Sequence, residues 1–439
     1  MTTLNANDNH PERHEQQPTG SHRSSHARLL APVPHYLPGP QQPRLKLSGL
    51  VVPTSRPVGM GSGLALASQF AEAKEAQLVV IRSGEASERC FSEAIAPRTA
   101  LPTAVIDLPP GAADGLIWRS NEQVVATLHR NNDVGFKRNL GLLLGRMCGW
   151  EALLYLDDDI RSTPASQPVG AARPTRRDPL ARLNDVLADF ATYPDLHAAG
   201  YFQRDMDDNS VVCHARRLVG QPQEIFISGG ALAVRVGGPL PFFSGAYNED
   251  WLFFLLLMLE GRHTLPSSAV RYVGTIHQDT YYPFSVPRAQ SEELGDLLAE
   301  GLFNLVGAAR EDLLATATSV GYWEDAVNER CRMISSLLAD LYRLGGGTRH
   351  GVMADAEQAL QAARNVYTDA SVDPAKAVAR FFEAFVSDQR SWSDLLAAVT
   401  PSRPEDAVSL EEALDILGLS GHVSWFGREG NVIPAIKAS

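Results

Sequence analysis

Three consecutive aspartates follow a short apolar run in the stretch LLYLDDDIR, Leu153 to Arg161. Neighbouring carboxylates repel, and each one disfavours ionisation of the next. A solvated turn or a divalent cation would offset that repulsion. Asp157 and Asp159 project to the same side of an extended chain and Asp158 points away, so two carboxylates can share one ion. Oxygen ligands suit Mg²⁺ or Mn²⁺, in particular an ion that bridges a diphosphate.

A basic pair precedes the aspartates, in the stretch NNDVGFKRNLGLLLGRMCGW. Its apolar residues recur on one helical face, which predicts a helix. Lys137, Arg138 and Asn139 fall near the start of that helix, after a loop that contains a glycine. The predicted strand EALLYL then returns and ends at the aspartates.

The first predicted strand, Leu47 to Val52, runs into the polar stretch VVPTSRP. Thr54, Ser55 and Arg56 offer hydrogen-bond donors there, and a plain turn forced by the two prolines is the alternative. GMGSG follows, but position 64 is leucine where a dinucleotide fingerprint needs glycine. We interpret GMGSG as a flexible loop or a helix start.

Three more signals lie further along the chain. Gly229 and Gly230 stand inside an apolar strand and mark either close approach to a ligand or a β-bulge. Glu249 and Asp250 open the apolar helix pattern NEDWLFFLLLMLEG, where acids meet the helix dipole favourably. His277, at the end of the predicted strand SAVRYVGTIHQD, is either structural or a metal ligand.

The elements that position these residues alternate between strand and helix, which predicts an α/β fold with a mixed sheet flanked by helices. Ligands of such sheets bind outside the carboxyl ends of the strands, where the aspartates are expected. The other predicted strands are AQLVVIRSG, TAVIDLPP, LHAAGYF, VVCHARRLV and EIFISGGALAVRV, and the other predicted helices cover Gly63 to Ala76 and RLNDVLADFATY. After about residue 286 the patterns are those of amphipathic helices.

Composition predicts a disordered tail over 1–44. The element patterns divide the rest into an α/β domain over 45–285 that contains the candidate site residues, a helical region over 286–400, and a tail of unclear structure over 401–439. The net charge of −12 argues against a nucleic-acid partner. Four scattered cysteines fit a reducing compartment. We expect a cytoplasmic protein without a membrane span, because there is no signal peptide and the longest apolar run, WLFFLLLML, is too short.

The unit from Asn131 to Asp159 contains a glycine, an Arg-Asn pair, a helix, and a strand that ends in Asp-x-Asp. This unit resembles the nucleotide-sugar-binding half of GT-A glycosyltransferases, particularly glycosyltransferase family 2. The resemblance covers about residues 45–285. It implies a GT-A fold (Rossmann-like, nucleotide-diphospho-sugar transferase) and an enzyme that moves a sugar from a UDP- or GDP-sugar to a hydroxyl of a small or soluble acceptor. It also implies a divalent cation, Mn²⁺ or Mg²⁺.

The resemblance also implies roles for the donor-site residues. Asp157 meets the ribose, Asp158 lies beside it, and Asp159 holds the metal, which His277 completes in several GT-A families. The loop of Pro53, Thr54, Ser55 and Arg56 meets the nucleobase and ribose, Lys137 and Arg138 add positive charge near Asn139, and the donor sugar lies against Gly229 and Gly230.

On the acceptor side, inverting members carry an acidic pair ending in Asp at this point in the chain, so Asp250 becomes the general base with Glu249 beside it. Trp251 either stacks on an acceptor sugar or packs in the core. The helical region shapes the acceptor site or forms a homodimer interface.

Departures from the family pattern leave alternatives open. The acidic run is shorter than is usual in family 2, and the downstream motif of processive enzymes is missing. The position of His277 is closer to retaining GT-A families that make glucosyl- or mannosyl-glycerate compounds. A sugar-phosphate nucleotidyltransferase is a second alternative. Such enzymes carry a Gly-rich loop with Arg directly after the first strand, whereas this chain has PTSRP there. A non-catalytic sugar or nucleotide-binding protein is a third, and it would tolerate loss of Asp250.

Overall fold

A mixed sheet forms the centre of the molecule, with the strand order β1-β9-β7-β8-β5-β2-β3-β4-β10-β11 and β6 paired to β9. The computed structural model describes residues 29–36, 43–55, 61–84, 102–112, 120, 133–162, 179–204, 210–221, 227–260, 266–278, 282–308, 312–344, 351–369, 371–427 and 432–433. The strands are β1 (Leu30–Pro32), β2 (Leu47–Thr54), β3 (Gln77–Arg82), β4 (Thr103–Asp107), β5 (Ala152–Leu156), β6 (Ile160–Arg161), β7 (Ala198–Arg204), β8 (Ile227–Arg235), β9 (Ser267–Gln278), β10 (Val423–Phe426) and β11 (Val432–Ile433).

The four strands β4, β3, β2 and β5 are mutually parallel neighbours, and their apolar runs are buried. Such runs are typical of parallel strands covered on both faces. The chain adds β3 and β4 on one side of β2 and then places β5 on the other side. A reversal of this kind creates a crevice at the carboxyl ends of the two central strands, which is where α/β sheets bind ligands. Thr54 ends β2 and Asp157 follows β5, so both residues lie at this crevice.

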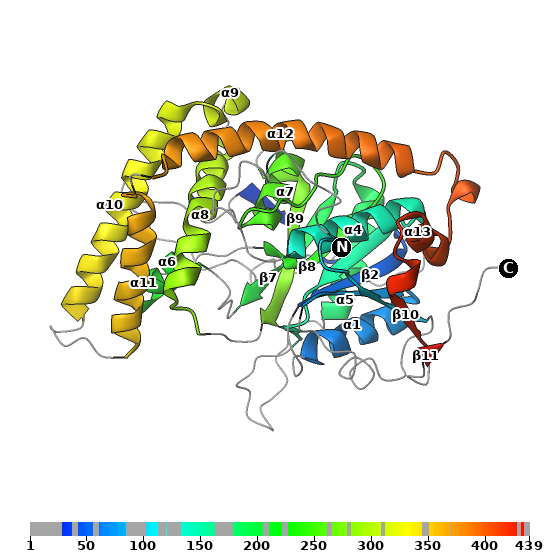
Figure 1. Cartoon of the computed structure of the whole chain (residues 1–439). Coiled ribbons are helices and arrows are strands. Elements are labelled where there is room, and N and C mark those ends of the chain that lie inside the picture. The colour runs from blue at the N-terminus through cyan, green and yellow to red at the C-terminus, as the bar shows by residue number, and fades with distance from the viewer. Residues whose placement is uncertain are drawn as a thin grey trace, which may run out of the picture.

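Helices cover both faces of the sheet (Figure 1). The helices α1 (Gly61–Lys74) and α5 (Pro179–Thr192) share one apolar cluster with the sheet. On the other face, α4 (Val134–Met147) and α7 (Glu249–Glu260) share a second cluster. The prediction of an α/β fold with a mixed sheet is confirmed, and GMGSG is indeed a helix start, since α1 begins at Gly61.

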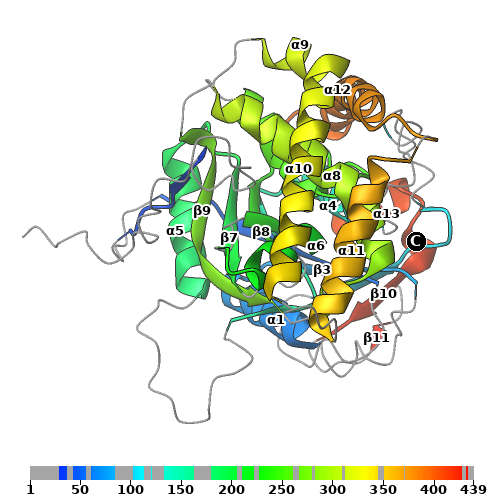
Figure 2. The same cartoon turned by 90° about the vertical axis from the view of Figure 1, so that its left-hand side faces the viewer.

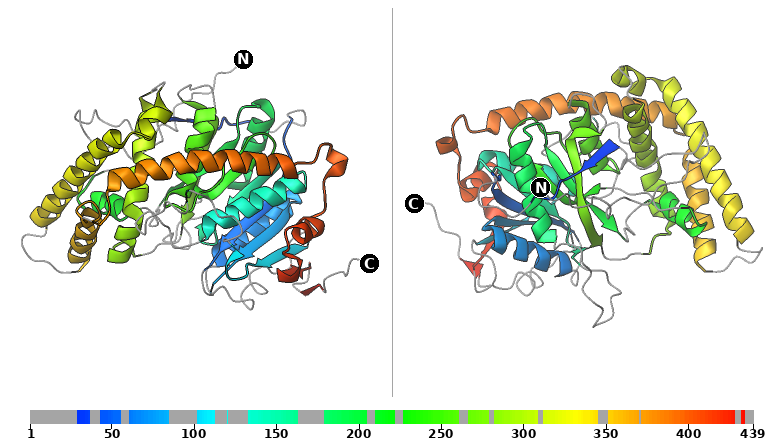
Figure 3. Two further views of the ribbon diagram at one scale, coloured as in Figure 1. Left: turned by 45° about the horizontal axis from the view of Figure 1, so that its top comes forward. Right: turned by 180° about the vertical axis from the view of Figure 1, so that it is seen from behind.

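In the described part of the chain, five helices lie between β9 and residue 400: α8 (Val286–Gly307), α9 (Leu313–Ala317), α10 (Val320–Leu344), α11 (Val352–Val366) and α12 (Pro374–Val399). α10 and α11 lie beside each other (Figure 2), at one end of the molecule in Figure 1. α12 runs from there back across α4 (Figure 3). Apolar residues of α4, α7, α8 and α12 belong to one cluster, so the helical region shares a core with the sheet. No described helix is both long enough and apolar enough to cross a bilayer.

The stretch VVCHARRLV, predicted as a strand, is instead the helix α6 (Val211–Leu218). Ser210 caps its start by accepting a hydrogen bond from the Cys213 amide at 3.3 Å. Arg216 and Arg217 occupy its last turn, where cations favour the helix dipole. The β-branched residues at its start suggested a strand, but helix packing against α11 and α8 prevails.

The predicted tails are partly ordered. The prediction of a disordered tail over 1–44 is wrong at residues 29–36. There β1 pairs in parallel with β9, and Leu30 is buried. After residue 400 the chain forms the helix α13 (Leu410–Ile416) and two short 3₁₀ turns, η3 (Pro404–Asp406) and η4 (Ser420–His422). It then adds β10 antiparallel to β4, so the C-terminal stretch extends the sheet.

Candidate active site

Arg138, in the second turn of α4, joins two acidic segments that are far apart in the sequence. Its Nη2 lies 3.1 Å from each carboxylate oxygen of Asp157, and its Nη1 donates to Oε1 of Glu249 at 2.7 Å. Arg138 is 3 % exposed and Glu249 is 1 % exposed. Water screens buried pairs weakly, so these contacts are stronger than surface ion pairs. The end of β5 and the start of α7 are therefore held together by one guanidinium group.

Lys137, next to Arg138 in α4, contacts the ends of β2 and β3. Its Nζ donates to the Thr54 carbonyl at 2.8 Å and to the Ser83 hydroxyl at 2.7 Å, and it pairs with Asp133 at 2.6 Å. Burial lowers the pKa of Lys137, and the carboxylate of Asp133 opposes that shift. Lys137 thus fixes the ends of β2 and β3 to the start of α4.

The three aspartates occupy different environments. Asp158 accepts a hydrogen bond from the Thr54 hydroxyl and is 5 % exposed. Asp159 is fully buried, and Gln278 Nε2 donates to it at 3.1 Å. The side chain of Asp157 is 24 % exposed. The prediction that Asp157 and Asp159 share one side assumed an extended chain, but the chain turns here, with the Ile160 amide donating to the Asp157 carbonyl at 3.2 Å.

His277 lies in β9, opposite the two-residue strand β6 that follows Asp159. In the pairing of β6 with β9, Ile160 faces Gln278 and Arg161 faces His277. Gln278, next to His277, is the residue of β9 whose side chain donates to Asp159. Within the described part of the chain, no three His, Cys, Asp or Glu side chains converge as a metal site would require.

Asp250 reaches the same cluster through the backbone of β8. Its Oδ2 accepts from the Gly229 amide at 2.7 Å and its Oδ1 from the Trp251 amide at 2.8 Å. A Cβ on Gly229 would lie 2.5 Å from Nη1 of Arg138, and a Cβ on Gly230 would lie 2.6 Å from Nε2 of Gln203. The two glycines therefore make room for protein side chains, and they also lie where the β7–β8 register shifts, between the pairs Gly200–Leu232 and Phe202–Ile227.

Other predicted site residues have structural contacts. Asn139 donates to the Phe243 carbonyl and accepts from the Phe243 amide, both at 2.8 Å, so it holds the chain that precedes α7. Trp251 is 4 % exposed and packs edge-on against Phe303 with ring centroids 5.9 Å apart, which favours the packing role.

The loop after β2 is described in part. Pro53 lies inside β2, paired in register with Ile81 of β3. Ser55, directly after β2, is exposed. Arg56 lies outside the described residues.

Sequence reasoning missed three polar residues of the site. Gln203 is buried beside Asp157 and Gly230, and its Nε2 has no hydrogen-bond partner among the residues that the structure describes. Gln278 donates to Asp159, and within the same described ranges its Oε1 has no partner. Asn248, directly before the acidic pair, has a φ of 67°, which is uncommon outside glycine. A polar residue late in an apolar strand was the available signal for both glutamines.

A separate cavity of about 760 Å³ lies at the other end of the sheet and is lined by Trp150, His197 and Arg235, among others. Trp150 precedes β5, whereas Asp157 follows it, so this cavity and the polar cluster are at opposite strand ends. The candidate active site is the polar cluster at the carboxyl ends.

No protein-family model matches the chain, and no curated protein sequence matches it. Similar solved structures include the following two. One is glucosyl-3-phosphoglycerate synthase from M. tuberculosis, with 14% identity and a TM-score of 0.33, covering 58% of this chain and 80% of that one. The other is the galactosyltransferase LgtC in complex with donor and acceptor sugar analogues, with 13% identity and a TM-score of 0.22, covering 51% of this chain and 72% of that one. We base the functional assignment on the polar cluster itself.

Proposed function

We propose that the protein is a glycosyltransferase that binds a nucleotide-diphosphate sugar at the crevice between β2 and β5. The observation that carries this proposal is the position of Arg138, which contacts Asp157 after β5 and Glu249 at the start of α7. The sequence resemblance assigns those two acidic segments to donor binding and to acceptor activation. A buried cation between them suits a reaction in which a diphosphate departs.

The residues present fit a divalent cation if its protein ligand is a different carboxylate from the one predicted from the sequence. Mg²⁺ is commonly bound by one or two carboxylates together with substrate phosphates. Asp157 is the partly exposed carboxylate of the aspartate run, whereas Asp159 is fully buried and bound by Gln278. We therefore assign Asp157, in place of Asp159 and His277, as the protein ligand of Mg²⁺ or Mn²⁺ that arrives with the nucleotide. Such a cation would neutralise charge on the leaving diphosphate.

The protein's own groups supply the remaining steps. Lys137 holds the end of β2, where Ser55 and the Thr54 backbone face the nucleoside. Arg138 keeps a positive charge beside the diphosphate. Asp250 accepts a proton from the acceptor hydroxyl as that oxygen attacks the anomeric carbon, which inverts the sugar. The amides of Gly229 and Trp251 fix the orientation of the Asp250 carboxylate.

Nucleotide-sugar turnover tests the proposal. We expect UDP or GDP to stabilise the protein in a thermal-shift panel with Mn²⁺, and the matching nucleotide sugar to release its diphosphate in the presence of a hydroxyl acceptor. The anomeric configuration of the product separates the inverting mechanism from the retaining alternative of the glucosyl- or mannosyl-glycerate type. Pyrophosphate release from a nucleoside triphosphate and a sugar phosphate would instead identify a nucleotidyltransferase. Binding of these ligands without any turnover would identify a binding protein.

A further inference from the structure

The helix α8 of the C-terminal region contacts the turn from which α7 and its acidic pair begin. A Cβ on Gly295 would lie 2.7 Å from the backbone carbonyl oxygen of Tyr247. One residue further along α8, Oδ1 of Asp296 accepts from the Asn248 side-chain amide at 2.9 Å. Two neighbouring residues of α8 therefore hold two neighbouring residues of the turn, one by close packing and one by a hydrogen bond.

Asn248 determines how α7 starts. Its carbonyl accepts a hydrogen bond from the Leu252 amide at 3.1 Å, which places Asn248 at the cap position of the helix. Cap residues usually adopt an extended backbone, but Asn248 has a φ of 67°. Residues in the left-handed region persist where their surroundings hold them. The Asp296 carboxylate provides such a hold, and Glu249 and Asp250 follow directly.

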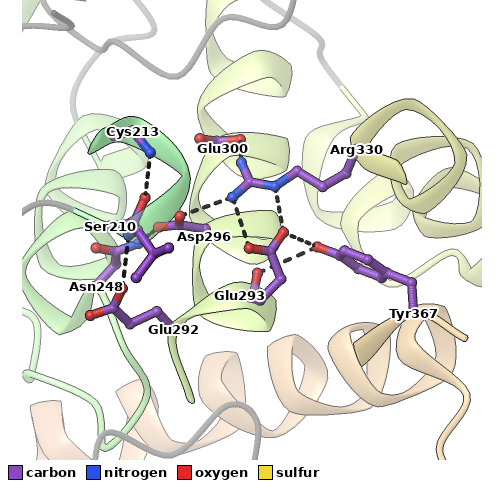
Figure 4. Close-up of polar contacts among 10 residues, drawn as sticks. Ser210, Cys213, Asn248, Glu292, Glu293, Asp296, Glu300, Arg330 and Tyr367 are labelled. Carbon is purple, nitrogen blue, oxygen red and sulfur yellow. Dashed lines mark hydrogen bonds and ion pairs between the residues drawn. The ribbon is translucent and has the colours of Figure 1, made fainter. Parts of the chain in front are cut away.

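Arg330 of α10 fixes the Asp296 carboxylate from the opposite side. Its Nη2 lies 3.0 Å from Oδ2 of Asp296, and its other nitrogens contact Glu293 and Glu300 at 2.6 Å (Figure 4). Arg330 is 2 % exposed and Asp296 is 4 % exposed. Burial alone lowers the pKa of Arg330, but the three carboxylates together raise it well above its ordinary value. Arg330 is therefore a permanent cation beside Asp296.

We propose that Asp296 and Arg330 are positioning residues for the acidic pair Glu249 and Asp250, and that they act through Asn248. The Asp296 carboxylate binds Asn248 with one oxygen and Arg330 with the other. The helical region thereby sets the orientation of the carboxylates that face Arg138 and the acceptor. The catalytic role of Asp250 in this inference rests on the proposed function. The positioning of the turn before α7 does not.

The experiment compares Asp296→Asn with Glu300→Gln. Both substitutions neutralise one buried carboxylate that pairs with Arg330 from the same helix, and Asp296 is the one that accepts from Asn248. We expect Asp296→Asn to lower kcat for diphosphate release from UDP-glucose or GDP-mannose by roughly 10 to 100-fold, because small displacements of catalytic groups have effects of that size. Glu300→Gln should change kcat less than about twofold at the same temperature, although both variants lose stability. Affinity for UDP or GDP should stay near that of the unaltered protein in both.

Two further measurements keep the proposal decidable. Asn248→Gly retains a positive φ without strain, so it should lose less turnover than Asn248→Ala, which loses both the conformation and the amide. Hydrogen exchange at amides 249–254 should accelerate in Asp296→Asn and not in Glu300→Gln. Equal kcat losses in Asp296→Asn and Glu300→Gln, or unchanged exchange at the start of α7 in Asp296→Asn, would overturn the proposal. If the unaltered protein transfers no sugar, the proposed function fails, and the exchange comparison still decides whether Asp296 positions the turn.

Discussion

The space that a side chain on Gly229 would fill is taken by the guanidinium group of Arg138, whose Nη1 lies 2.5 Å from the position of that Cβ. The Gly229 amide also donates to Asp250 at 2.7 Å. One residue of β8 therefore borders both the cation and the proposed base. Any side chain at this position moves Arg138 away from Asp157 and Glu249.

Gly229→Ala should lower turnover far more than it lowers stability. The methyl group displaces Arg138, and we expect kcat to fall by about 10 to 100-fold, while the free energy of unfolding falls by about 1–3 kcal/mol. Gly237→Ala is the control, because a Cβ there meets no atom within 4 Å. Enzyme assays and urea denaturation of the two variants measure the difference. Equal turnover in the two variants would contradict a role for the Arg138 position.

Asp250→Asn should abolish turnover and keep nucleotide binding. The amide retains the shape of the side chain but cannot take a proton from a hydroxyl, and a general base contributes typically 10²–10⁴-fold. We expect a loss in kcat of about that size, measured with the nucleotide sugar that stabilises the protein best. Calorimetry with the matching nucleoside diphosphate checks that affinity is unchanged. Turnover close to that of the unaltered protein would remove Asp250 from the mechanism.

Asp157→Asn and Asp159→Asn distinguish the two metal assignments. If Asp157 is the protein ligand, its replacement should remove the gain in UDP or GDP affinity that Mg²⁺ or Mn²⁺ provides. Asp159→Asn should retain that gain, since Asp159 is fully buried and bound by Gln278. Calorimetric titrations with and without EDTA measure the gain in each variant. The reverse result would restore the assignment made from the sequence.

Arg330→Met should destabilise the protein strongly. The substitution leaves Glu293, Asp296 and Glu300 buried without their cation, and breaking a buried ion pair costs about 3–5 kcal/mol. Arg343→Met, on the same helix, removes an exposed ion pair with Asp340 and should cost less than about 1 kcal/mol. Urea denaturation of both variants gives the two values. Similar values would show that the buried cluster is not held by Arg330.

Cys213 should make stability depend on alkaline pH. Burial raises the pKa of its thiol to about 12, from an ordinary value of 9.0. Between these two values the folded state keeps a proton that the unfolded state loses. The contribution of Cys213 to the free energy of unfolding is therefore complete below pH 9 and declines as the pH rises toward 12. Between those limits we expect a loss of about 1.4 kcal/mol per pH unit. Unfolding measured from pH 8 to 10.5 should show a shallower slope in Cys213→Ala, and identical slopes would refute this.

The order of elements could be predicted because hydrophobic periodicity is local. Apolar runs such as ALLYL and amphipathic patterns such as the one in α12 identify strands and helices over short windows. The same rule failed for α6, because its β-branched residues are locally compatible with a strand. Packing against α8 and α11 stabilises the helix instead. The ordered residues 29–36 were missed for a similar reason, since a three-residue strand is stabilised by its partner β9.

The sequence by itself determined which residues carry chemistry: the aspartates after β5, the basic pair in α4, the glycine pair in β8, and the acidic pair of α7. Their types are given by the sequence, and the local hydrophobic pattern predicts that they lie at the ends of strands and helices. Only the tertiary structure decided how they combine, because side-chain direction depends on turns and register. The chain turns at Asp158, between Asp157 and Asp159, and the β6–β9 pairing brings Gln278 to Asp159. The link from Arg330 through Asp296 to Asn248 joins residues distant in sequence, and only packing brings them into contact.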